Sequence, residues 1–451
     1  MPERGHLIRT LAGLGVALAA GGALLFGAPA RSGEPQPLAL SAAWPRAQRG
    51  SVPSKLPDGN EYSPALFLDA KTSAGTAQSP DGHTLRLILR QADGTLRELR
   101  RVPSTDRAPF AALTSYSTAP TAAGPAASAT APAAPLSATS ASAASSPAPL
   151  SATSASTAAS PAAPLPATSA PLPGTSASAA PTPATSGPAP AVPDSAASAS
   201  AVTAPAPAAA GSGDGLVWVE SVRGKQQLWT GGLRQPARML TADVGAMQFY
   251  DSQYDLVIAN GAVHWVAGGA ADQTEFRSVA LTGGRVTVTR SAGTWALSAW
   301  PWAVDGQTSA RGATTLRNLT TGRRIAVPSA DRTVTACSPA WCQLVSLNAD
   351  GYARMELSHP DGSARRKVAE GTVATAITDV AVLDRFEVLA RVGPQSDLSG
   401  NQELLIHDLR TRQTVLVSPD AGNIAYRAGV LWWSTGDQSS FVRNSLDLRT
   451  I

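Results

Sequence analysis

The chain has 451 residues, of which 15% are charged, and its formal net charge at pH 7 is +4. A chain of this length has room for several domains or for one large repeat fold. Its basic residues are scattered and do not cluster with aromatic side chains, so the composition argues against a nucleic-acid partner.

Residues 1–30 have the pattern of a secretory signal peptide. A basic start is followed by an uncharged apolar run over residues 11–27 and by the small residues Ala28 and Ala30, which suit cleavage. The run is shorter than the ~20 residues that usually span a bilayer. We therefore expect a secreted or cell-envelope protein with no membrane span after cleavage. The alternative is an uncleaved N-terminal membrane anchor.

Residues 31–116 contain the first β-strand patterns. TLRLILRQ (84–91) alternates apolar and polar side chains, ADG (92–94) has the composition of a hairpin turn, and TLRELRRV (95–102) returns. Further upstream, QPLALS (36–41) is a candidate lone strand. We assign this region to the first part of a β fold.

Residues 117–213 consist almost entirely of Ala, Ser, Thr and Pro. The only charged residue between Arg107 and Asp214 is Asp194. Such a segment cannot bury enough apolar surface to offset the entropy lost on ordering. We therefore expect residues 117–213 to be a disordered, low-complexity insertion.

Strand patterns resume over residues 214–451, where a strand with an aromatic residue recurs. These aromatic markers are Trp218, Trp265, Trp302, Trp341, Phe386 and Trp432. Their spacing of 37 to 47 residues is the size of a four-stranded propeller blade. A second strand follows each marker, and with the early copy there are seven such pairs. The pattern predicts an all-β, seven-bladed β-propeller, with six blades as the alternative, and assigns the marker aromatics to its core.

The Ala/Pro-rich tract fits this repeat as an insertion. Without it, the first two copies would be about 44 residues apart, which is one normal repeat. FAALTSYS (110–117) and GLVWVES (215–221) would then be neighbouring strands of one blade, since closure entropy grows slowly with loop length. The rival, two domains joined by a linker, leaves residues 31–116 with too few strands for a stable sheet. Because the last copy lacks a returning strand, we expect QPLALS to close the ring.

Cys337 and Cys342 are the two cysteines of the chain. In an exported protein they are expected to form a disulfide, and Pro339 between them suits a tight turn. The two thiols would then face each other across a hairpin. A metal site would need further ligands, and no other Cys or His lies nearby. We expect a structural disulfide, no metal and no cofactor.

Four segments of the chain resemble the TolB-like β-propellers, and most closely an exported actinobacterial group of that type. They are WVES…QLW…G, SVALTGG, LSHPDGSARR and VLWWSTG. The resemblance covers about residues 62–116 and 214–451, and it implies a binding or scaffolding module of the cell envelope. It implies no functional residue, because the matching positions are structural.

Motifs for catalysis are not found in the sequence. The nucleophile motif G-x-S-x-G, the metal motif H-E-x-x-H, a glycine-rich phosphate loop and an Asp-rich calcium loop are all missing from it. We therefore expect a protein that is not an enzyme. The alternative is a propeller hydrolase acting on a glycan or peptide, because carboxylates paired only by folding leave no spacing signal.

One end of the propeller is favoured for binding. The links between blades and the links after each marker strand lie at this end. Their candidate binding residues are Asp243, Trp295, Asp331, Arg332, Asp397 and Asp420. The rival interpretation is that Asp and Gly are simply turn residues here. We expect a monomer whose partner is an unidentified protein, peptide or glycan of the envelope. A third hypothesis is that the propeller only displays the tract as a spacer.

Overall fold

The structure is a computed structural model. It describes residues 36–104, 109–117, 215–270, 272–306, 309–328, 330–349, 351–393, 396, 400–436 and 441–451. The expected signal peptide and all but one residue of the expected disordered insertion lie outside these ranges. Within the described ranges, no helix has the length and apolar character needed to cross a membrane.

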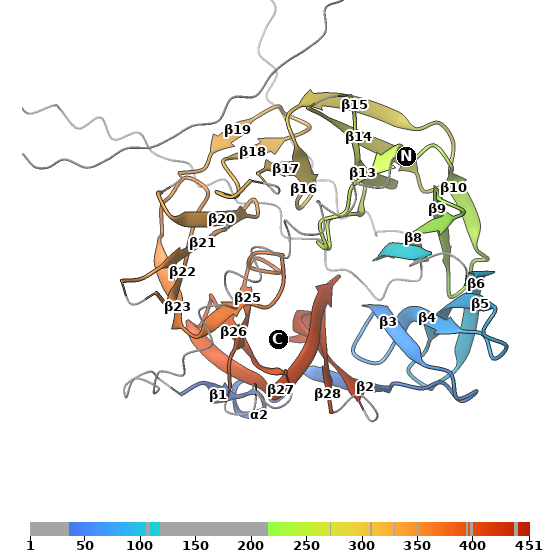
Figure 1. Ribbon diagram of the computed structural model, residues 1–451, viewed down its shortest axis with the longest axis horizontal. Helices are drawn as coiled ribbons and strands as arrows, with labels where there is room; N and C mark the ends of the chain where they lie inside the picture. The colour runs from blue at the N-terminus through green and yellow to red at the C-terminus, as the bar shows by residue number, and fades with distance from the viewer. Residues whose placement is uncertain are drawn as a thin grey trace, which may run out of the picture. The chain divides into compact units, whose positions relative to one another are not determined.

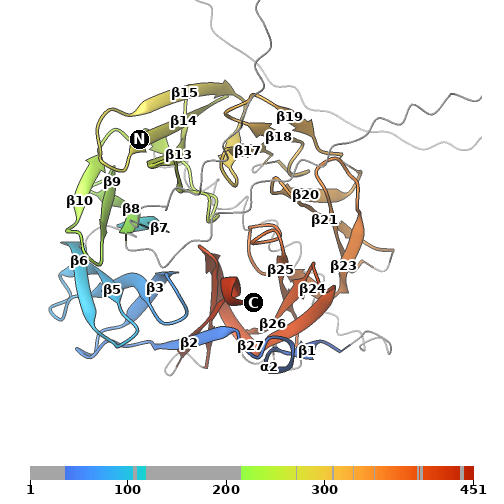
Figure 2. The same ribbon diagram turned by 180° about the vertical axis from the view of Figure 1, so that it is seen from behind.

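Antiparallel sheets follow one another around a ring (Figures 1 and 2). The first sheet has the order β3 (Tyr62–Phe67), β4 (Ser73–Gln78), β5 (Thr84–Arg90), β6 (Leu96–Pro103). The second has the order β10 (Arg238–Thr241), β9 (Lys225–Gly232), β8 (Gly215–Val222), β7 (Phe110–Tyr116). The third has the order β11 (Ala246–Met247), β13 (Ala262–Gly268), β14 (Gln273–Ala280), β15 (Thr287–Ala292), with β12 (Val257–Ala259) also on β13.

Two further four-stranded sheets continue the ring. The fourth consists of β16 (Trp295–Leu297), β17 (Trp302–Asp305), β18 (Thr315–Asn318) and β19 (Arg324–Ala326). The fifth consists of β20 (Thr333–Cys337), β21 (Cys342–Leu347), β22 (Ala353–Ser358) and β23 (Arg366–Gly371). This is the all-β propeller architecture that the sequence repeat predicts.

The sixth sheet has eight strands. It contains β24 (Val373–Thr375), β25 (Phe386–Arg391), β26 (Gln402–Asp408), β27 (Gln413–Arg427), β28 (Val430–Thr435), β29 (Val442–Asp447), β2 (Gln48–Pro53) and β1 (Leu38–Ala39). The first part of β27 pairs with β26 and its last part pairs with β28. Divided there, the sheets make seven sets of strands; undivided, they make six. The blade number therefore stays a prediction.

The N-terminal segment supplies the outer strand of the last set, but the expected strand is wrong. β2 pairs with the whole of β29, from Gln48 opposite Asp447 to Pro53 opposite Val442. QPLALS instead contains the short β1, which runs parallel to β27, and the start of the helix α2 (Leu40–Ala43). A Cβ at Gly50 would lie 1.8 Å from the Ala70 carbonyl oxygen, so this strand is selected by close backbone approach and not by an apolar pattern.

The marker aromatics lie on the second strands of their sheets or just before them. Trp218 and Trp265 have no exposed surface, and Phe386 and Trp432 are also buried, which confirms their place in the core. The markers Trp302 and Trp341 are only half-buried.

The second strand of the first sheet, β4, has no recognisable strand pattern in the sequence. The early sequence copy corresponds to its third and fourth strands, β5 and β6, and β4 was not predicted. The sequence of β4, SAGTAQ, contains no large apolar residue. Small residues are required because a Cβ at Gly75 would lie 2.3 Å from the Ser63 carbonyl oxygen on β3.

The Ala/Pro-rich tract leaves and rejoins the second sheet at paired positions. β7 and β8 are antiparallel neighbours, as expected, with Tyr116 opposite Gly215. The Tyr116 ring occupies the place where a side chain at residue 215 would lie, and its hydroxyl is 3.0 Å from Thr230 Oγ1. Tyr116 and Gly215, which flank the tract in the sequence, are therefore held side by side.

The disulfide expected between Cys337 and Cys342 is confirmed. Cys337 ends β20, Cys342 begins β21, and the two residues are directly opposite in the antiparallel pair. The bond therefore closes a hairpin, as the spacing of the cysteines indicates. The part of the chain that the structure describes has no free cysteine.

Candidate functional site

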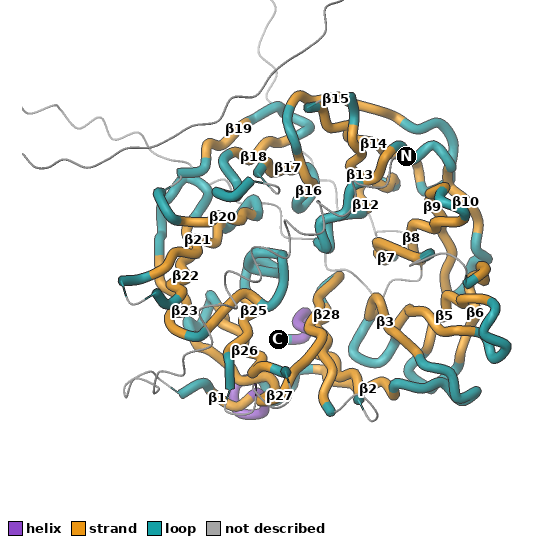
Figure 3. The backbone as a smooth tube through the Cα atoms, viewed as in Figure 1, coloured by secondary structure: helices purple, strands orange, loops and turns teal. Residues whose placement is uncertain are grey.

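A loop of the third sheet reaches toward the centre of the ring. We call residues 248–256, between β11 and β12, the strap. β11 and β12 both pair with β13, so the strap interrupts what would otherwise be a single inner strand. Figure 3 shows this loop running from β12 toward the middle of the ring. The strap therefore adds a stretch of backbone near the middle of the ring that no regular strand would supply.

The strap is hydrogen-bonded to the link between β24 and β25. Ser252 Oγ donates to Asp379 Oδ1 at 2.6 Å, and the backbone N–H of Gln253 donates to Asp379 Oδ2 at 3.1 Å. Thr378 Oγ1 donates to the carbonyl oxygen of Asp251 at 2.8 Å. These contacts join segments about 127 residues apart in sequence and hold the strap in place.

Two buried carboxyl groups belong to this region, Asp255 of the strap and Asp379. Burial raises the pKa of Asp255 to about 6, although a hydrogen bond from the Tyr250 N–H and the charge of Arg427 oppose that shift. Burial likewise raises the pKa of Asp379, against its hydrogen bonds from the strap. Asp379 also adds to the rise at Asp255, so the two groups lie in one electrostatic neighbourhood.

Two arginines border this cluster, and each has spare hydrogen-bonding capacity. Arg427, the last residue of β27, lies 4.0 Å from Asp255 Oδ2 and donates to the Leu113 carbonyl oxygen at 3.5 Å. Both distances are at the weak end for such contacts. Arg443, on β29, has a buried Nε with no hydrogen-bond partner among the described residues. A guanidinium has five N–H donors, so both side chains can accept further partners.

A hollow of about 480 Å³ lies beside these groups. It receives residues from β3, the strap, the β24–β25 link, β27, β28 and β29. Its charged lining residues are Asp251, Asp379, Arg427 and Arg443. Its large apolar lining residues are Ile377, Ile424 and Trp432. Apolar walls with a few converging polar groups are typical of small-ligand sites.

The predicted binding residues have separate surroundings. Asp243 pairs with Arg277 at 2.8 Å, and Asp331 and Arg332 are exposed just before β20. Trp295 is 6% exposed and its Nε1 donates to the Ala292 carbonyl oxygen, so its ring belongs to the core.

Two predicted binding residues remain. Asp420 lies within β27, where its N–H donates to Ser418 Oγ at 3.4 Å. Asp397 lies outside the described residues. A binding role for the six-residue set stays a prediction.

Sequence reasoning missed the central residues Asp255, Asp379, Arg427 and Arg443. They come from four separate segments, and only folding brings them to one place. The one available signal was the strap sequence QFYDSQYDL, a polar and aromatic interruption between two strand patterns. Groups of three or more His, Cys, Asp or Glu arranged to hold a metal are not found within the described ranges.

No protein-family model matches this chain, and no curated protein matches it. Solved structures do resemble it. TolB from Acinetobacter baumannii is 11% identical, with 72% of this chain and 65% of that chain covered and a TM-score of 0.28. A Mycobacterium tuberculosis puromycin-hydrolyzing peptidase is 11% identical, with 87% and 54% covered and a TM-score of 0.44.

A third similar structure is the β-propeller domain of the Trilobed protease from Pyrococcus furiosus. It is 9% identical, with 51% of this chain and 78% of that chain covered and a TM-score of 0.35. The chain spans only 40% of the length of a matched prolyl endopeptidase. TolB and propellers of other kinds thus stand together among the similar structures, and with TM-scores below 0.5 none of them bears on activity. The exported actinobacterial type stays a prediction.

Proposed function

We propose that this protein is an exported, non-enzymatic binding module of the cell envelope, and that the hollow beside the strap is its ligand site. The observation that carries the proposal is the hollow itself. Its volume of about 480 Å³ is within the usual range for small-ligand pockets, and it combines apolar walls with two arginines of spare capacity. Export rests on the pattern of residues 1–30.

In this proposal the buried carboxyl groups of Asp255 and Asp379 have a structural role. Both oxygens of Asp379 accept hydrogen bonds from the strap, and Asp255 Oδ1 accepts one from the Tyr250 N–H. A general acid or base must be able to reach the substrate. Asp255 is only 7% exposed and Asp379 only 8%. These contacts favour a role in holding the strap over a role in proton transfer.

The second candidate is a hydrolase acting on a glycan or peptide. Its supporting observation is the carboxyl pair, because Asp255 has its pKa raised to about 6 while Asp379 lies in the same neighbourhood. Paired carboxyl groups with displaced pKa values are how glycoside hydrolases assign the acid and base roles.

One experiment separates the two candidates. The full chain is incubated with peptide and glycan libraries, and mass spectrometry follows both bound ligand and cleaved product. The binding module predicts saturable binding, no product, and binding retained in a folded Asp255→Asn variant. Product that disappears in Asp255→Asn and Asp379→Asn would establish the hydrolase instead. If the experiment detects no binding and no product, both candidate functions are wrong.

Export has its own test. The chain is produced in a bacterium with a general secretion pathway, and the N-terminus of the secreted protein is sequenced. Cleavage near Ala30 supports export, and retention of residues 1–30 in a membrane fraction supports the anchor.

A further inference from the structure

Arg443 is a strand arginine that lines the hollow and has no carboxylate partner among the described residues. Several other strand arginines of this propeller pair with acids, for example Arg100 with Glu220, Arg277 with Glu275 and Arg391 with Glu403, and so does Arg385, just before β25, with Asp408. Arg366 also has a buried Nε without a partner, but it does not line the hollow. Arg443 has no ion pair with any acid in the described part of the chain, and its Nε is buried without a hydrogen-bond partner. Its guanidinium carbon lies 5.1 Å from the centre of the Phe441 ring.

This arrangement leaves a positive charge partly removed from water and uncompensated. Burial lowers the pKa of Arg443, and no acid among the described residues raises it back. Arginine nevertheless stays protonated in proteins, so the cost of partial desolvation falls on the folded state. A group kept at such a cost in the wall of a hollow is suited to a ligand that supplies the missing negative charge.

Arg427 adds a second cation to the same hollow. Its contacts to Asp255 and Leu113, at 4.0 and 3.5 Å, leave most of its donors available. A planar guanidinium binds a carboxylate through two parallel N–H···O bonds, which gives both strength and orientation.

We propose that the hollow binds an organic carboxylate, with Arg443 and Arg427 as its anion-binding residues. The inference rests on the binding function proposed above and names the ligand class. The apolar part of the ligand would contact Ile377, Ile424 and the Trp432 ring, which line the same hollow.

The charge of the lining favours a single negative charge over two. Asp251 and Asp379 line the hollow together with the two arginines, so the formal charges of these four side chains cancel and the arginines act as local cationic groups in a lining of no net charge. A doubly charged phosphate would meet more repulsion from Asp251 than a carboxylate would. A carboxylate joined to an apolar group matches both the charge and the walls.

The test is calorimetric titration of the full chain with defined probes. N-acetyl-phenylalanine and its amide have nearly the same shape, but the amide is neutral and has an NH2 group in place of one carboxylate oxygen. Gly-Gly-Phe with a free or an amidated C-terminus tests a peptide as the source. Inorganic phosphate is the third arm. We expect the acids to bind about tenfold or more tightly than the amides, which is the size of a charge-assisted hydrogen bond. Tighter binding of the free tripeptide than of the acetyl amino acid identifies a peptide terminus.

Variants place the site. Arg443→Ala should weaken acid binding by about tenfold or more, and Arg443→Lys should weaken it less, since it keeps the charge without the fork. Asp251→Asn should tighten acid binding by a few-fold, because it removes a like charge. The matched control is Arg101→Ala, since Arg101 lies on β6 in an exposed pair with Glu98, and it should leave the affinity unchanged. If Arg443→Ala does not fold, the Lys variant carries the test.

Asp437 needs its own control because it lies outside the described residues, six positions before Arg443. Asp437→Asn should leave acid affinity within about twofold if it is only a surface charge. A large gain in acid affinity would show that the Asp437 carboxylate pairs with Arg443 in the wild type, and this result would overturn the proposal. Equal binding of acid and amide, stronger binding of phosphate, or no effect of either Arg443 variant would overturn it as well. If the acids fail but another library ligand binds in the hollow, the binding module survives and only the carboxylate is wrong.

Discussion

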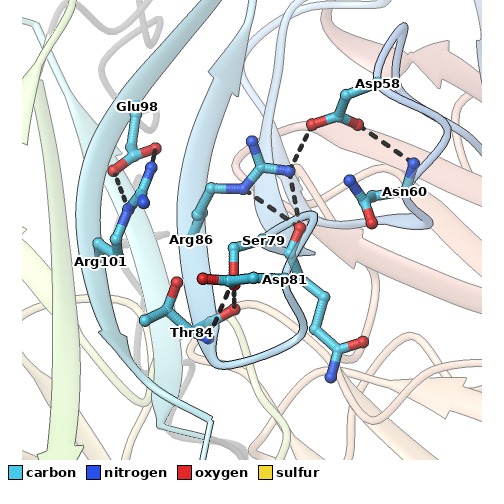
Figure 4. A network of polar contacts seen from close by, with 9 residues as sticks. Asp58, Asn60, Ser79, Asp81, Thr84, Arg86, Glu98 and Arg101 are labelled. Atoms are coloured by element: carbon cyan, nitrogen blue, oxygen red, sulfur yellow. Dashed lines mark hydrogen bonds and ion pairs between the residues drawn. The ribbon is translucent and has the colours of Figure 1, made fainter.

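Charged side chains are used in two different ways in this propeller, on the outer part of the first sheet and at the centre of the ring. On the first sheet, Arg86 donates to Asp58 and to the Gln78 carbonyl oxygen, both at 2.7 Å (Figure 4). Beside it, Arg101 donates two bonds of 2.8 Å to Glu98. Every charge in this network has a close partner.

Fewer of the charged groups at the centre of the ring have close partners. Arg443 has no acidic partner among the described residues, Arg427 is held only by long contacts, and burial raises the pKa values of Asp255 and Asp379. A network with all its partners present mainly serves structure. A desolvated network whose donors lack partners can bind a ligand, and its missing contacts reduce the stability of the folded state.

The largest expected effect comes from removing Asp379 at the centre. Asp379→Ala leaves the Ser252 hydroxyl and the Gln253 N–H without their acceptor, and we expect the free energy of unfolding to fall by about 4 kcal/mol. Urea denaturation measures the loss, and hydrogen exchange at the Gln253 amide should accelerate. Asp379→Asn, which keeps the shape and one acceptor, should lose less. An unchanged Gln253 exchange rate would show that Asp379 does not hold the strap.

The pH dependence of Asp255 gives the next effect. Its pKa is raised from 3.8 to about 6 by burial, so the folded state holds its proton more tightly than the unfolded state. The stability from this group is complete below about pH 4 and is lost as the pH rises through 6, by at most about 3 kcal/mol. Asp379 acts in the same direction, so Asp255→Asn should reduce the loss between pH 4 and 7 without abolishing it.

Denaturation midpoints at several pH values check this prediction. Asp93→Asn is the control, because hydrogen bonds from Thr95 lower the pKa of Asp93 and its titration falls below that window. Stability that rises between pH 4 and 7 in the wild type and not in Asp255→Asn would contradict the assigned sign.

A smaller effect is expected on the first sheet. Asp58→Ala removes the partner of Arg86, but Asp58 is 30% exposed, so the loss should be about 1 kcal/mol or less. The comparison of Asp58→Ala with Asp379→Ala in the same urea series measures how different the two regions are. A loss as large as that of Asp379→Ala would erase the distinction between them.

The sequence repeat predicted most of the fold, and the strands that it missed were missed for physical reasons. The spacing of Trp218 and its counterparts predicted the propeller and the adjacency of β7 and β8, since periodic burial leaves a periodic sequence. β2 and β4 escaped that pattern because Gly50 and Gly75 lie against neighbouring backbone, where an apolar side chain cannot fit. Close approach selects small residues and therefore leaves little pattern.

The candidate site could not be predicted from local sequence. Asp255 and Asp379 belong to links of different sheets, and Arg427 and Arg443 are ordinary-looking residues of two strands. Their meaning depends on which partners folding places beside them. Trp295 shows the converse, because its position in a link made it a candidate binding residue, while the fold buries it at the start of β16.

The smallest effect is expected for Glu98 and Arg101. Their side chains are 36% and 52% exposed, so water and salt screen the pair, and Glu98→Gln should cost about 0.5 kcal/mol or less. A double-mutant cycle with Arg101→Ala isolates the coupling of the two side chains. The coupling should shrink further in 1 M salt, where screening acts within a few ångströms. A coupling above about 1 kcal/mol would mean that geometry outweighs exposure on this strand.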